Sequence, residues 1–521
     1  MIRAILCKDA KLLWPLILLV TLIQACLEWA WHRYGAFGDD VAAGQLLRPL
    51  TFAWFVGLCG LTIAIFLQDA VPSLDQDWLI RPIARRDLLL AKVLLTAGAI
   101  LVPMYAFNLA RALATGFALA PSLEEAAIKE ALVGAWLLVP VAAIAATAAT
   151  FTELLVLGAA LIGVYAGGTL LAAVLLGAGT CPTCGTGTVW IEHTIQHAGV
   201  LAGACAILWV QYFRRRTQLS RALALVGALA LAWLHLPWSS AFAIESRLSP
   251  WPGSGRQIIV ALAPQSEDAA VRQLSGGSPS RSAGGWGSLL ERRSSAAPVR
   301  LDLPITLSGV GTDERVFVDA THLRLSDRQG HTLYEGMNGG LFGQGSLARP
   351  DAATDQAVLL PAPVYRRIAA RAEQLELDYY MTLFARTSRY RLAAEYGTLQ
   401  APDMGRCATR VDPTGLSINL RCRQIGPSPS CVSAVLLGPE GHHDPELWDC
   451  DPDYRPDLPG FTNVLRFYSL DVPIRDPLGV ASYPVTPAEL SRSYLLISVY
   501  GARDHFRRAL VVPNTRLEAW R

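Results

Sequence analysis

Charge is scarce in this chain, and lysine is almost absent from it. Charged residues make up 17% of the 521 residues and apolar residues 52%, whereas a soluble protein usually has about 25% charged residues. The lysines are Lys8, Lys11, Lys92 and Lys129. This composition excludes a wholly soluble enzyme, a disordered chain and a fibrous protein. The net charge of +2 gives no basis for electrostatic attraction to nucleic acid, so we expect no nucleic-acid partner.

The motifs of common catalytic sites are also missing. An ATP-binding P-loop needs a lysine followed by serine or threonine, and none of the four lysines has such a neighbour. The sequence contains neither the H-E-x-x-H motif of zinc proteases nor the G-x-S-x-G nucleophile elbow. We therefore expect the chain not to be an enzyme, to have no cofactor of its own, and not to hydrolyse ATP through a P-loop.

The few charges are distributed unevenly. Residues 1–244 hold 28 charged residues, and residues 245–521 hold 60. Because about 20 apolar residues cross the hydrocarbon core as a helix, the first part predicts an α-helical polytopic membrane domain. Its seven transmembrane helices are expected at residues 12–32, 47–68, 88–108, 131–149, 154–177, 195–213 and 220–242. Thr150, Thr152 and Glu153 interrupt the fourth and fifth runs, which predicts a tight helical hairpin there.

Basic residues give the orientation. With the N-terminus in the cytoplasm, the inner segments carry eleven lysines and arginines, and the outer loops carry four, namely Arg33, Arg48, Arg111 and Lys129. Such a bias follows the positive-inside rule. It predicts a multi-pass protein of the bacterial inner membrane whose residues 245–521 are periplasmic.

The cysteines agree with this orientation. An even number fall on the predicted outer side: Cys181, Cys184, Cys407, Cys422, Cys431 and Cys450. Because disulfides persist in oxidising compartments such as the periplasm, we expect disulfides among them. The last four can pair in three ways, and the sequence does not select one.

The outer part has the pattern of a β-rich, sandwich-like region. A short strand at 257–262 precedes a Ser/Gly-rich stretch, so residues 245–298 are expected to form a linker. Period-two alternation then predicts strands, at residues 299–307, 316–325, 377–385, 416–423, 431–437, 465–470 and 493–499. One helix is expected at 363–375. We divide this part into two periplasmic β-domains, at 299–410 and 411–521.

Two other patterns have alternative explanations. Cys181-x-x-Cys184 followed by His193 and His197 offers four ligands of the type that zinc binds, but the gap between the pairs is shorter than in zinc fingers. A local disulfide or structural role is therefore favoured over a metal site. Gly163-x-x-x-Gly167 permits close helix packing, within the chain or between subunits.

The segment between the second and third apolar runs is the most informative. It contains Asp77-Trp78-Leu79-Ile80-Arg81-Pro82-Ile83-Ala84-Arg85-Arg86, and re-enters the membrane through Leu88-Leu89-Leu90-Ala91-Lys92. As a short amphipathic element it offers an apolar anchor at Trp78 and Leu79, and positive charge at its arginines, to lipid or to a protein partner. Positive-inside anchoring alone explains the arginines but not the order Asp-Trp-Leu-x-Arg-Pro.

This order resembles the permease subunits of bacterial ABC exporters of the type-two class, in a Trp-Leu-x-Arg-Pro-Ile-x-Arg pattern followed by Leu-Leu-x-x-Lys. The resemblance extends over roughly residues 1–242. It implies that segment 69–92 contacts a separate cytoplasmic ATPase subunit, which binds the ATP, through Asp77, Trp78, Leu79, Arg81, Pro82, Arg85 and Arg86. It also implies a second permease chain, identical or related, beside this one in the lipid bilayer.

The chain departs from that family in having a seventh apolar run and a large outer region, since six helices are usual there. An alternative function is therefore a polytopic membrane anchor for a periplasmic sensing or binding module, without transport. Fold and topology alone do not decide between the two.

Overall fold

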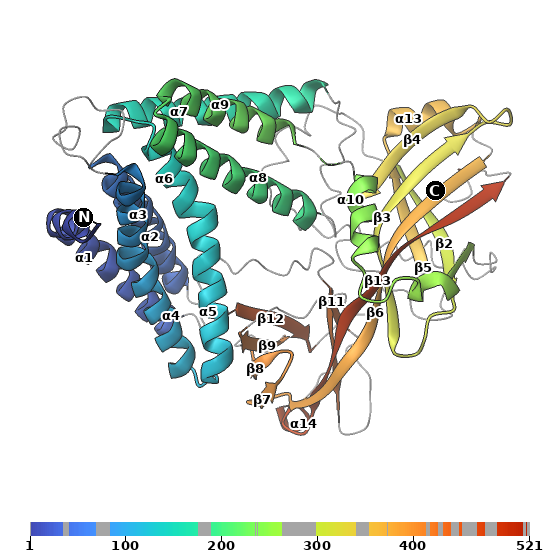
Figure 1. Ribbon diagram of the computed structural model, residues 1–521. Helices are drawn as coiled ribbons and strands as arrows, with labels where there is room; N and C mark the ends of the chain where they lie inside the picture. Colours follow the sequence, from blue (N-terminus) through green and yellow to red (C-terminus); the bar gives the residue numbers. More distant parts are fainter. Residues whose placement is uncertain are drawn as a thin grey trace.

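A computed structural model shows a helical bundle followed by a β-rich region (Figure 1). The structure describes residues 2–34, 41–68, 84–175, 189–234, 236, 238–262, 299–339, 354–371, 374–412, 417–425, 431–438, 447–450, 466–474, 487–513 and 517. The order of the two regions agrees with the predicted fold class.

Long apolar helices make up the bundle. Within the described residues, six stretches are long and apolar enough to cross a membrane, or seven if one bent pair counts as a single crossing, which indicates a multi-pass membrane protein. The helices are α1 (Ile2–Tyr34), α2 (Val41–Leu67), α3 (Arg85–Thr96), α4 (Val102–Ala114), α5 (Leu119–Val133), α6 (Val139–Ala145), α7 (Phe151–Leu175), α8 (Val189–Trp209), α9 (Thr217–Trp233) and α10 (Trp238–Arg247).

Short π-helical turns join several of these helices end to end. They are η2 (Ala97–Leu101) between α3 and α4, η3 (Gly134–Leu138) between α5 and α6, and η4 (Val210–Arg214) after α8. Pro103 and Pro140 follow the first two turns closely. A proline removes a backbone donor and clashes with the carbonyl four residues earlier, and a π-helical turn just before it absorbs that defect without breaking the helix.

The prediction was wrong about the connection between the third and fourth helices. Residues 109–130 were expected to form an outer loop, but α4 continues to Ala114 and α5 begins at Leu119, so only a short turn separates them. Arg111 and Lys129 therefore lie inside helices and are buried. Their charges lower the hydropathy of this stretch, and the prediction ended the helices where those charges occur.

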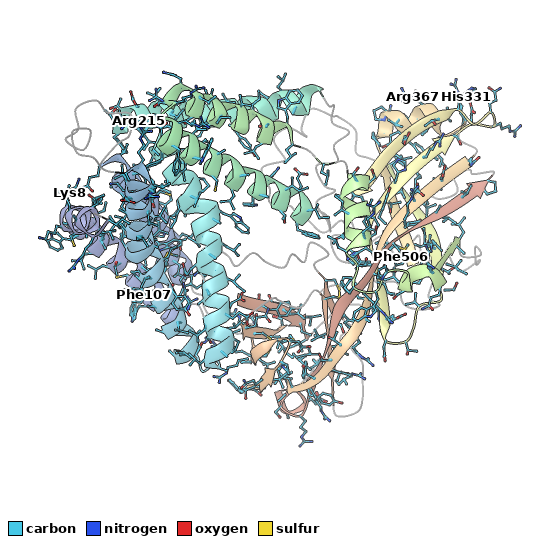
Figure 2. All side chains as sticks on the ribbon, in the orientation of Figure 1. Lys8, Phe107, Arg215, His331, Arg367 and Phe506 are labelled. Carbon is cyan, nitrogen blue, oxygen red and sulfur yellow. A yellow bond between two sulfur atoms is a disulfide. The ribbon has the colours of Figure 1, made fainter. Side chains whose placement is uncertain are left out.

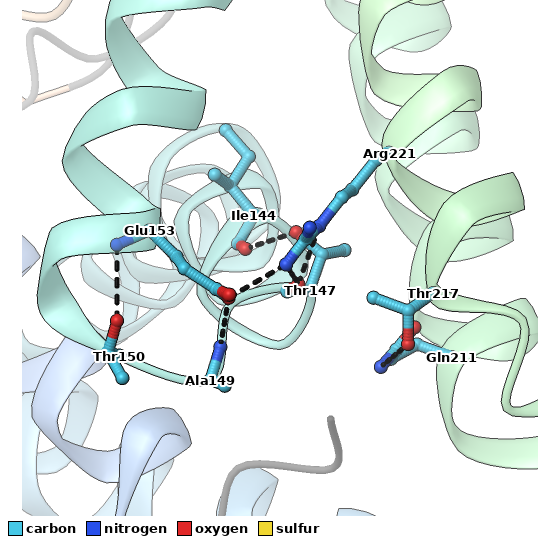
Figure 3. A network of polar contacts seen from close by, with 8 residues as sticks. All are labelled: Ile144, Thr147, Ala149, Thr150, Glu153, Gln211, Thr217 and Arg221. Atoms are coloured by element: carbon cyan, nitrogen blue, oxygen red, sulfur yellow. Dashed lines mark hydrogen bonds and ion pairs between the residues drawn. The ribbon is translucent and has the colours of Figure 1, made fainter. Parts of the chain in front are cut away.

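The predicted break between the fourth and fifth helices at Thr150 is confirmed, but the two helices do not form a hairpin, because α7 packs mainly on α9 and α6 on α8. Thr150 Oγ1 accepts a hydrogen bond from the backbone N–H of Glu153 at 3.2 Å, and Glu153 Oε2 accepts one from the N–H of Ala149 at 2.9 Å (Figure 3). This reciprocal arrangement is a capping box, which satisfies free N–H groups at the start of α7. Arg221 of α9 donates to the Thr147 carbonyl and to Glu153 Oε2, at 3.0 and 2.8 Å.

The seventh predicted helix, at 220–242, is broken. Helix α9 ends at Trp233, and α10 begins at Trp238 after a bend of 90°. The intervening sequence contains Pro237, which cannot donate the hydrogen bond that a continuing helix needs. Helix α10 consequently packs on the β-rich region through strand β13 (Tyr494–Pro513).

We define the two ends of the bundle by these connections. The inner end carries the start of α3, the turn at 146–150 and the turn at 215–216, and Arg215 marks it in Figure 2. The outer end carries the turn at 115–118, the start of α8 and α10. These names follow the orientation that the basic residues predict.

The β-rich region contains antiparallel sheets in the orders β1-β2-β5, β11-β10-β13-β6-β3-β4 and β12-β9-β8-β7. The strands besides β13 are β1 (Ile259–Leu262), β2 (Val299–Ser308), β3 (Glu314–Ser326), β4 (Thr332–Gly339), β5 (Thr354–Leu360), β6 (Gln374–Ala393), β7 (Thr398–Ala401), β8 (Gly405–Val411), β9 (Ser417–Gln424), β10 (Cys431–Leu437), β11 (Leu447–Cys450) and β12 (Arg466–Pro473). Each predicted strand overlaps one of these. The helix expected at 363–375 is shorter, because α13 spans Ala362–Ile368 and β6 begins at Gln374.

Strands β6 and β13 form a long ribbon that both β cores share. They pair from Gln374 with Pro513 to Ala393 with Tyr494. At one end, Leu377 and Leu510 belong to a core that includes residues of β2 and β5. At the other end, Leu392 and Leu495 belong to a core with residues of β8, β9 and β12. There are thus two sandwich-like cores, but the boundary expected at 410/411 does not separate the strands that build them.

The structure selects one of the three ways in which the four late cysteines can pair, with disulfides Cys407–Cys422 and Cys431–Cys450. Each joins residues directly opposite each other on neighbouring antiparallel strands, β8 with β9 and β10 with β11. These disulfides agree with an oxidising, extracytoplasmic location for this region. Cys181 and Cys184 lie outside the described residues.

We predict that peptide mapping of the unreduced protein recovers these two linkages and not Cys407–Cys431 or Cys422–Cys450. The double substitution C407S/C422S should destabilise the outer region by roughly 3 kcal/mol, the value for a closed loop of about 15 residues. Chemical denaturation of the purified full chain measures this change. Recovery of a crossed linkage, or unchanged stability, would contradict the pairing.

Candidate functional site

The predicted coupling segment lies at the inner end, immediately before α3. Five of its residues fall outside the described part of the chain, namely Asp77, Trp78, Leu79, Arg81 and Pro82. Arg85 and Arg86 form the first turn of α3, and both are exposed. The structure therefore shows where the segment joins the bundle.

Arg85 connects this helix start to a different part of the bundle. Its Nη1 donates to the carbonyl oxygen of Phe213, in η4, at 3.3 Å. Arg86 points to its own helix, with Nε 3.8 Å from Asp87 Oδ1. The beginning of α3 is thus held against the end of the α8–η4 helix.

A buried ion pair fixes α3 to α1 close to the same end. Lys92 Nζ donates to Asp9 Oδ2 at 2.9 Å, and the two side chains are 0% and 1% exposed. Lys92 is the lysine of the Leu-Leu-x-x-Lys pattern that carries the family resemblance, and Asp9 comes from the basic N-terminal segment. Buried charges of this kind are tolerated only when they are paired.

A second polar cluster lies nearer the outer end, and we term it the outer polar cluster: Gln24, Glu28, Asn108, Arg111, Lys129 and Glu130. Arg111 Nη1 lies 2.7 Å from Glu28 Oε2, and Gln24 Nε2 donates to Glu28 Oε1 at 2.8 Å. Asn108 joins the neighbouring helices, because its amide donates to Glu130 Oε1 at 2.8 Å and its oxygen accepts from Lys129 Nζ at 2.9 Å. The cluster therefore connects α1, α4 and α5.

This cluster was not predicted from the sequence, although the sequence contains a signal for it. Gln24 and Glu28 are four residues apart, and Asn108 and Arg111 three apart, so each pair lies on one helix face. Polar pairs with this spacing inside apolar runs mark a face that contacts other helices instead of lipid. The analysis treated Arg111 and Lys129 only as loop charges for orientation.

The glycine pattern of α7 does not mediate close packing within the described chain. A Cβ added at Gly163 or Gly167 would meet no described atom within 4 Å. Gly168 is the position of close approach, since a Cβ there would lie 2.8 Å from the Cβ of Ala232 in α9. The subunit-contact alternative for Gly163 and Gly167 stays a prediction.

The two histidines of the alternative metal site lie on α8. His197 Nδ1 is 2.5 Å from the carbonyl oxygen of His193, and its ring lies 4.6 Å from that of Trp136. These contacts fit the structural role for His197 that was preferred over zinc. Among the described residues, no group of three or more potential ligands of the His, Cys, Asp or Glu type is close enough to hold a metal, while Cys181 and Cys184 lie outside them.

A third polar group occurs where α10 meets the six-stranded sheet. Glu245 of α10 accepts a hydrogen bond from Trp190 Nε1 of α8 at 3.1 Å, and its Oε2 lies 3.9 Å from Nδ1 of His505 in β13. His505 Nδ1 is also 2.9 Å from Thr382 Oγ1, which donates to Asp319 Oδ2 at 2.7 Å. Burial lowers the pKa of His505 to about 4, although the adjacent Asp504 carboxylate acts to raise it.

Comparisons with known proteins do not add a family. No family model and no curated protein matches the sequence. Among solved structures, a protein named pT26-6p is similar over 39% of this chain and 60% of its own length, with 8% identity and a TM-score of 0.11. The match thus spans less than two thirds of that protein, and a TM-score this low carries no argument about fold or function.

We predict that Lys92→Met destabilises the bundle by roughly 3–5 kcal/mol, because it removes the buried cation that is hydrogen-bonded to Asp9 and leaves only the exposed Lys8 ammonium, 3.6 Å from Asp9 Oδ1. The double variant D9L/K92M removes both charges and should recover most of that loss. Lys11→Met, at an exposed position of α1, serves as the control and should change stability by less than about 0.5 kcal/mol. Unfolding of the purified chain in mixed detergent measures these effects, and a single variant as stable as the parent would refute the role of the pair.

We also predict that acid weakens the α10–sheet contact through His505. A histidine whose pKa is lower in the folded state stabilises that state above its unfolded pKa of about 6.5, and this contribution is lost as pH falls toward 4. The loss is roughly 3 kcal/mol at about 1.4 kcal/mol per pKa unit. Hydrogen exchange of β13 between pH 7 and 4 measures it.

His505→Gln should remove this component of the acid dependence. His331→Gln is the matched control, because His331 is exposed at the β3–β4 turn, well separated from Phe506 beside His505 (Figure 2). An identical pH profile for the parent and the His505 variant would show that His505 does not titrate in this way.

Proposed function

We propose that this chain is the membrane-spanning permease subunit of an ATP-driven exporter. Its cytoplasmic segment 69–92 would contact a separate ATPase subunit, and a second permease chain, identical or related, would complete the transporter. The absence of a P-loop in the sequence fits a motor on another chain. The path for the substrate would be formed by helix faces, without a catalytic side chain.

The observation that carries this proposal is the attachment of α3 at the inner end. The segment with the exporter-like motif leads directly into α3, and Arg85 and Lys92 tie that helix to η4 and to α1. A displacement of the segment would therefore move α3 together with two other parts of the bundle. This is the mechanical property that a contact site for an external motor requires.

The alternative is an anchor for an outer sensing or binding module. The observation that favours it is the size and independent packing of the β-rich region, which has two apolar cores and two disulfides of its own. In that case the helices would hold the module and relay its state, and no ATPase would be needed.

We predict that the chain co-purifies with a cytoplasmic ATPase subunit from its native membranes. Charge reversal at Arg81, Arg85 and Arg86 should abolish this association, because the positive charge that faces the partner is removed and reversed. Reversal of Arg3 and Lys11, which lie on the exposed face of α1, is the matched control and should leave the association intact. Absence of an ATPase from the parent preparation would refute the proposal.

A truncation after Arg247 distinguishes the exporter permease from the sensing anchor. A permease without its β-rich region should still bind the ATPase, since the coupling segment is at the other end of the bundle. A sensing anchor should lose its only activity. Quantification of the ATPase by mass spectrometry in both preparations gives the answer.

A further inference from the structure

The helices form two groups, which we term the first group (α1–α6) and the second group (α7–α9). They contact each other through α6 with α7 and α8, and through α3 with η4. The ring contact between Trp136 and His197 lies at mid-bundle, while the Arg85 and Arg221 hydrogen bonds lie at the inner end. In Figure 1 the two groups diverge from the upper left of the view toward the β-rich region.

Arg406 of the β-rich region binds the turn at the outer end of the first group. Arg406 of β8 donates from Nη1 to the Thr115 carbonyl at 2.7 Å and from Nη2 to the Gly116 carbonyl at 2.8 Å. Its guanidinium also lies 5.9 Å from the ring centre of Phe117. Gly116 has a φ of +83°, and a Cβ there would lie 2.6 Å from Arg406 Nη2. The turn between α4 and α5 is thus shaped to receive this side chain.

The same region holds the outer end of the second group through α10. Glu245 is bonded to Trp190 at the start of α8. On the other side, α10 packs on the six-stranded sheet through Phe242, whose ring lies 5.0 Å from that of Tyr380 in β6. Phe242, Tyr380 and Ala320 are buried together in this contact.

The β6–β13 ribbon connects the two attachments. The sheet that contains β8 packs on one end of the β6–β13 ribbon, and α10 packs on β13 and β6 further along it. Each strand of the ribbon has 20 residues and extends about 65 Å, and the two cores pack against its two ends. The distance between Arg406 and α10 is consequently set by the β-rich region itself.

We propose that the outer β-rich region is a brace that sets the separation of the two helix groups at their outer ends, and that Arg406 is its releasable contact. Arg406 is exposed to water and binds through backbone carbonyls and one ring, so it can detach without opening a core. The α10 contact is buried and aromatic, and it stays attached. Release of Arg406 lets the outer ends move while the inner end keeps its hydrogen bonds. This inference concerns the mechanics of the chain and does not depend on the proposed transport.

Electron–electron distance measurements between spin labels test the brace in the full-length protein. Cys7, Cys26, Cys59, Cys181, Cys184 and Cys205 are first replaced by serine. One pair of labels, at A118C and T194C, reports the outer ends, and a second pair, at A84C and Q218C, reports the inner end; Ala118, Thr194, Ala84 and Gln218 are all exposed. Arg406→Ala should broaden the outer distribution and shift its mean by several ångströms, with the inner distribution unchanged.

Two matched controls isolate the contact. Arg410→Ala removes an exposed arginine from the same face of β8 and should leave both distributions unchanged. Gly116→Ala should reproduce the effect of Arg406→Ala, because the new methyl group occupies the position of the guanidinium. Gly330→Ala introduces the same backbone strain, at a φ of +81°, with no described atom within 4 Å, and should have no effect.

The remaining outcomes contradict the proposal. If the outer distribution of the Arg406 and Gly116 variants superimposes on that of the parent, the β-rich region does not set the separation. If both pairs of labels broaden in these variants, the contact supports the bundle as a whole and is not a brace at the outer ends.

Discussion

The pairing of buried charges is the constraint on which the helical bundle depends. An ionised side chain costs roughly 2.5–3.5 kcal/mol at the centre of a membrane helix, so Asp9, Lys92, Glu28 and Arg111 are acceptable only because each has an opposite charge beside it. Helix α1 supplies the carboxylate of both pairs. Since Asp9 and Glu28 are about 28 Å apart along a helix, α1 is fixed against the α3–α4 helix at two levels, and the register between them cannot slip.

The distribution of apolar residues predicted most of this fold. Transmembrane helices appear in the sequence as long apolar runs, and half-buried strands appear as alternating apolar and polar residues. The helix break at Thr150 was also predictable, since the residues that cap the start of α7 are close together in sequence. The start of α5 was not predictable. Lys129 and Glu130 lower the local hydropathy, and the side chains that pair with them inside the bundle, such as Asn108, belong to another helix. The shared β6–β13 ribbon was missed for a similar reason, as strands more than 100 residues apart pair in it.

The candidate site was predictable only where residues are contiguous. The order from Asp77 to Arg86 predicts a coupling segment, which stays a prediction, and Lys92 is part of the same pattern. That Lys92 pairs with Asp9, 83 residues away, depends on the packing of α1 against α3, which no local pattern encodes. Arg406 is the clearest case, because nothing in its sequence neighbourhood distinguishes it from Arg410, and its role follows from the turn at Gly116 that it meets.

One element joins the predicted motor contact to the outer region. The α3–η2–α4 helix runs without a break from Arg85 to Ala114, about 45 Å for 30 residues. At its inner end it follows the coupling segment, and at its outer end it enters the turn that Arg406 holds. The π-helical turn at 97–101 is the point at which its two halves can adjust relative to each other. In the proposed exporter, a displacement at the inner end would reach the Arg406 contact through this helix, with α1 keeping it in register. In the proposed exporter, such a relay would need no catalytic side chain, which fits a chain with so few charged residues.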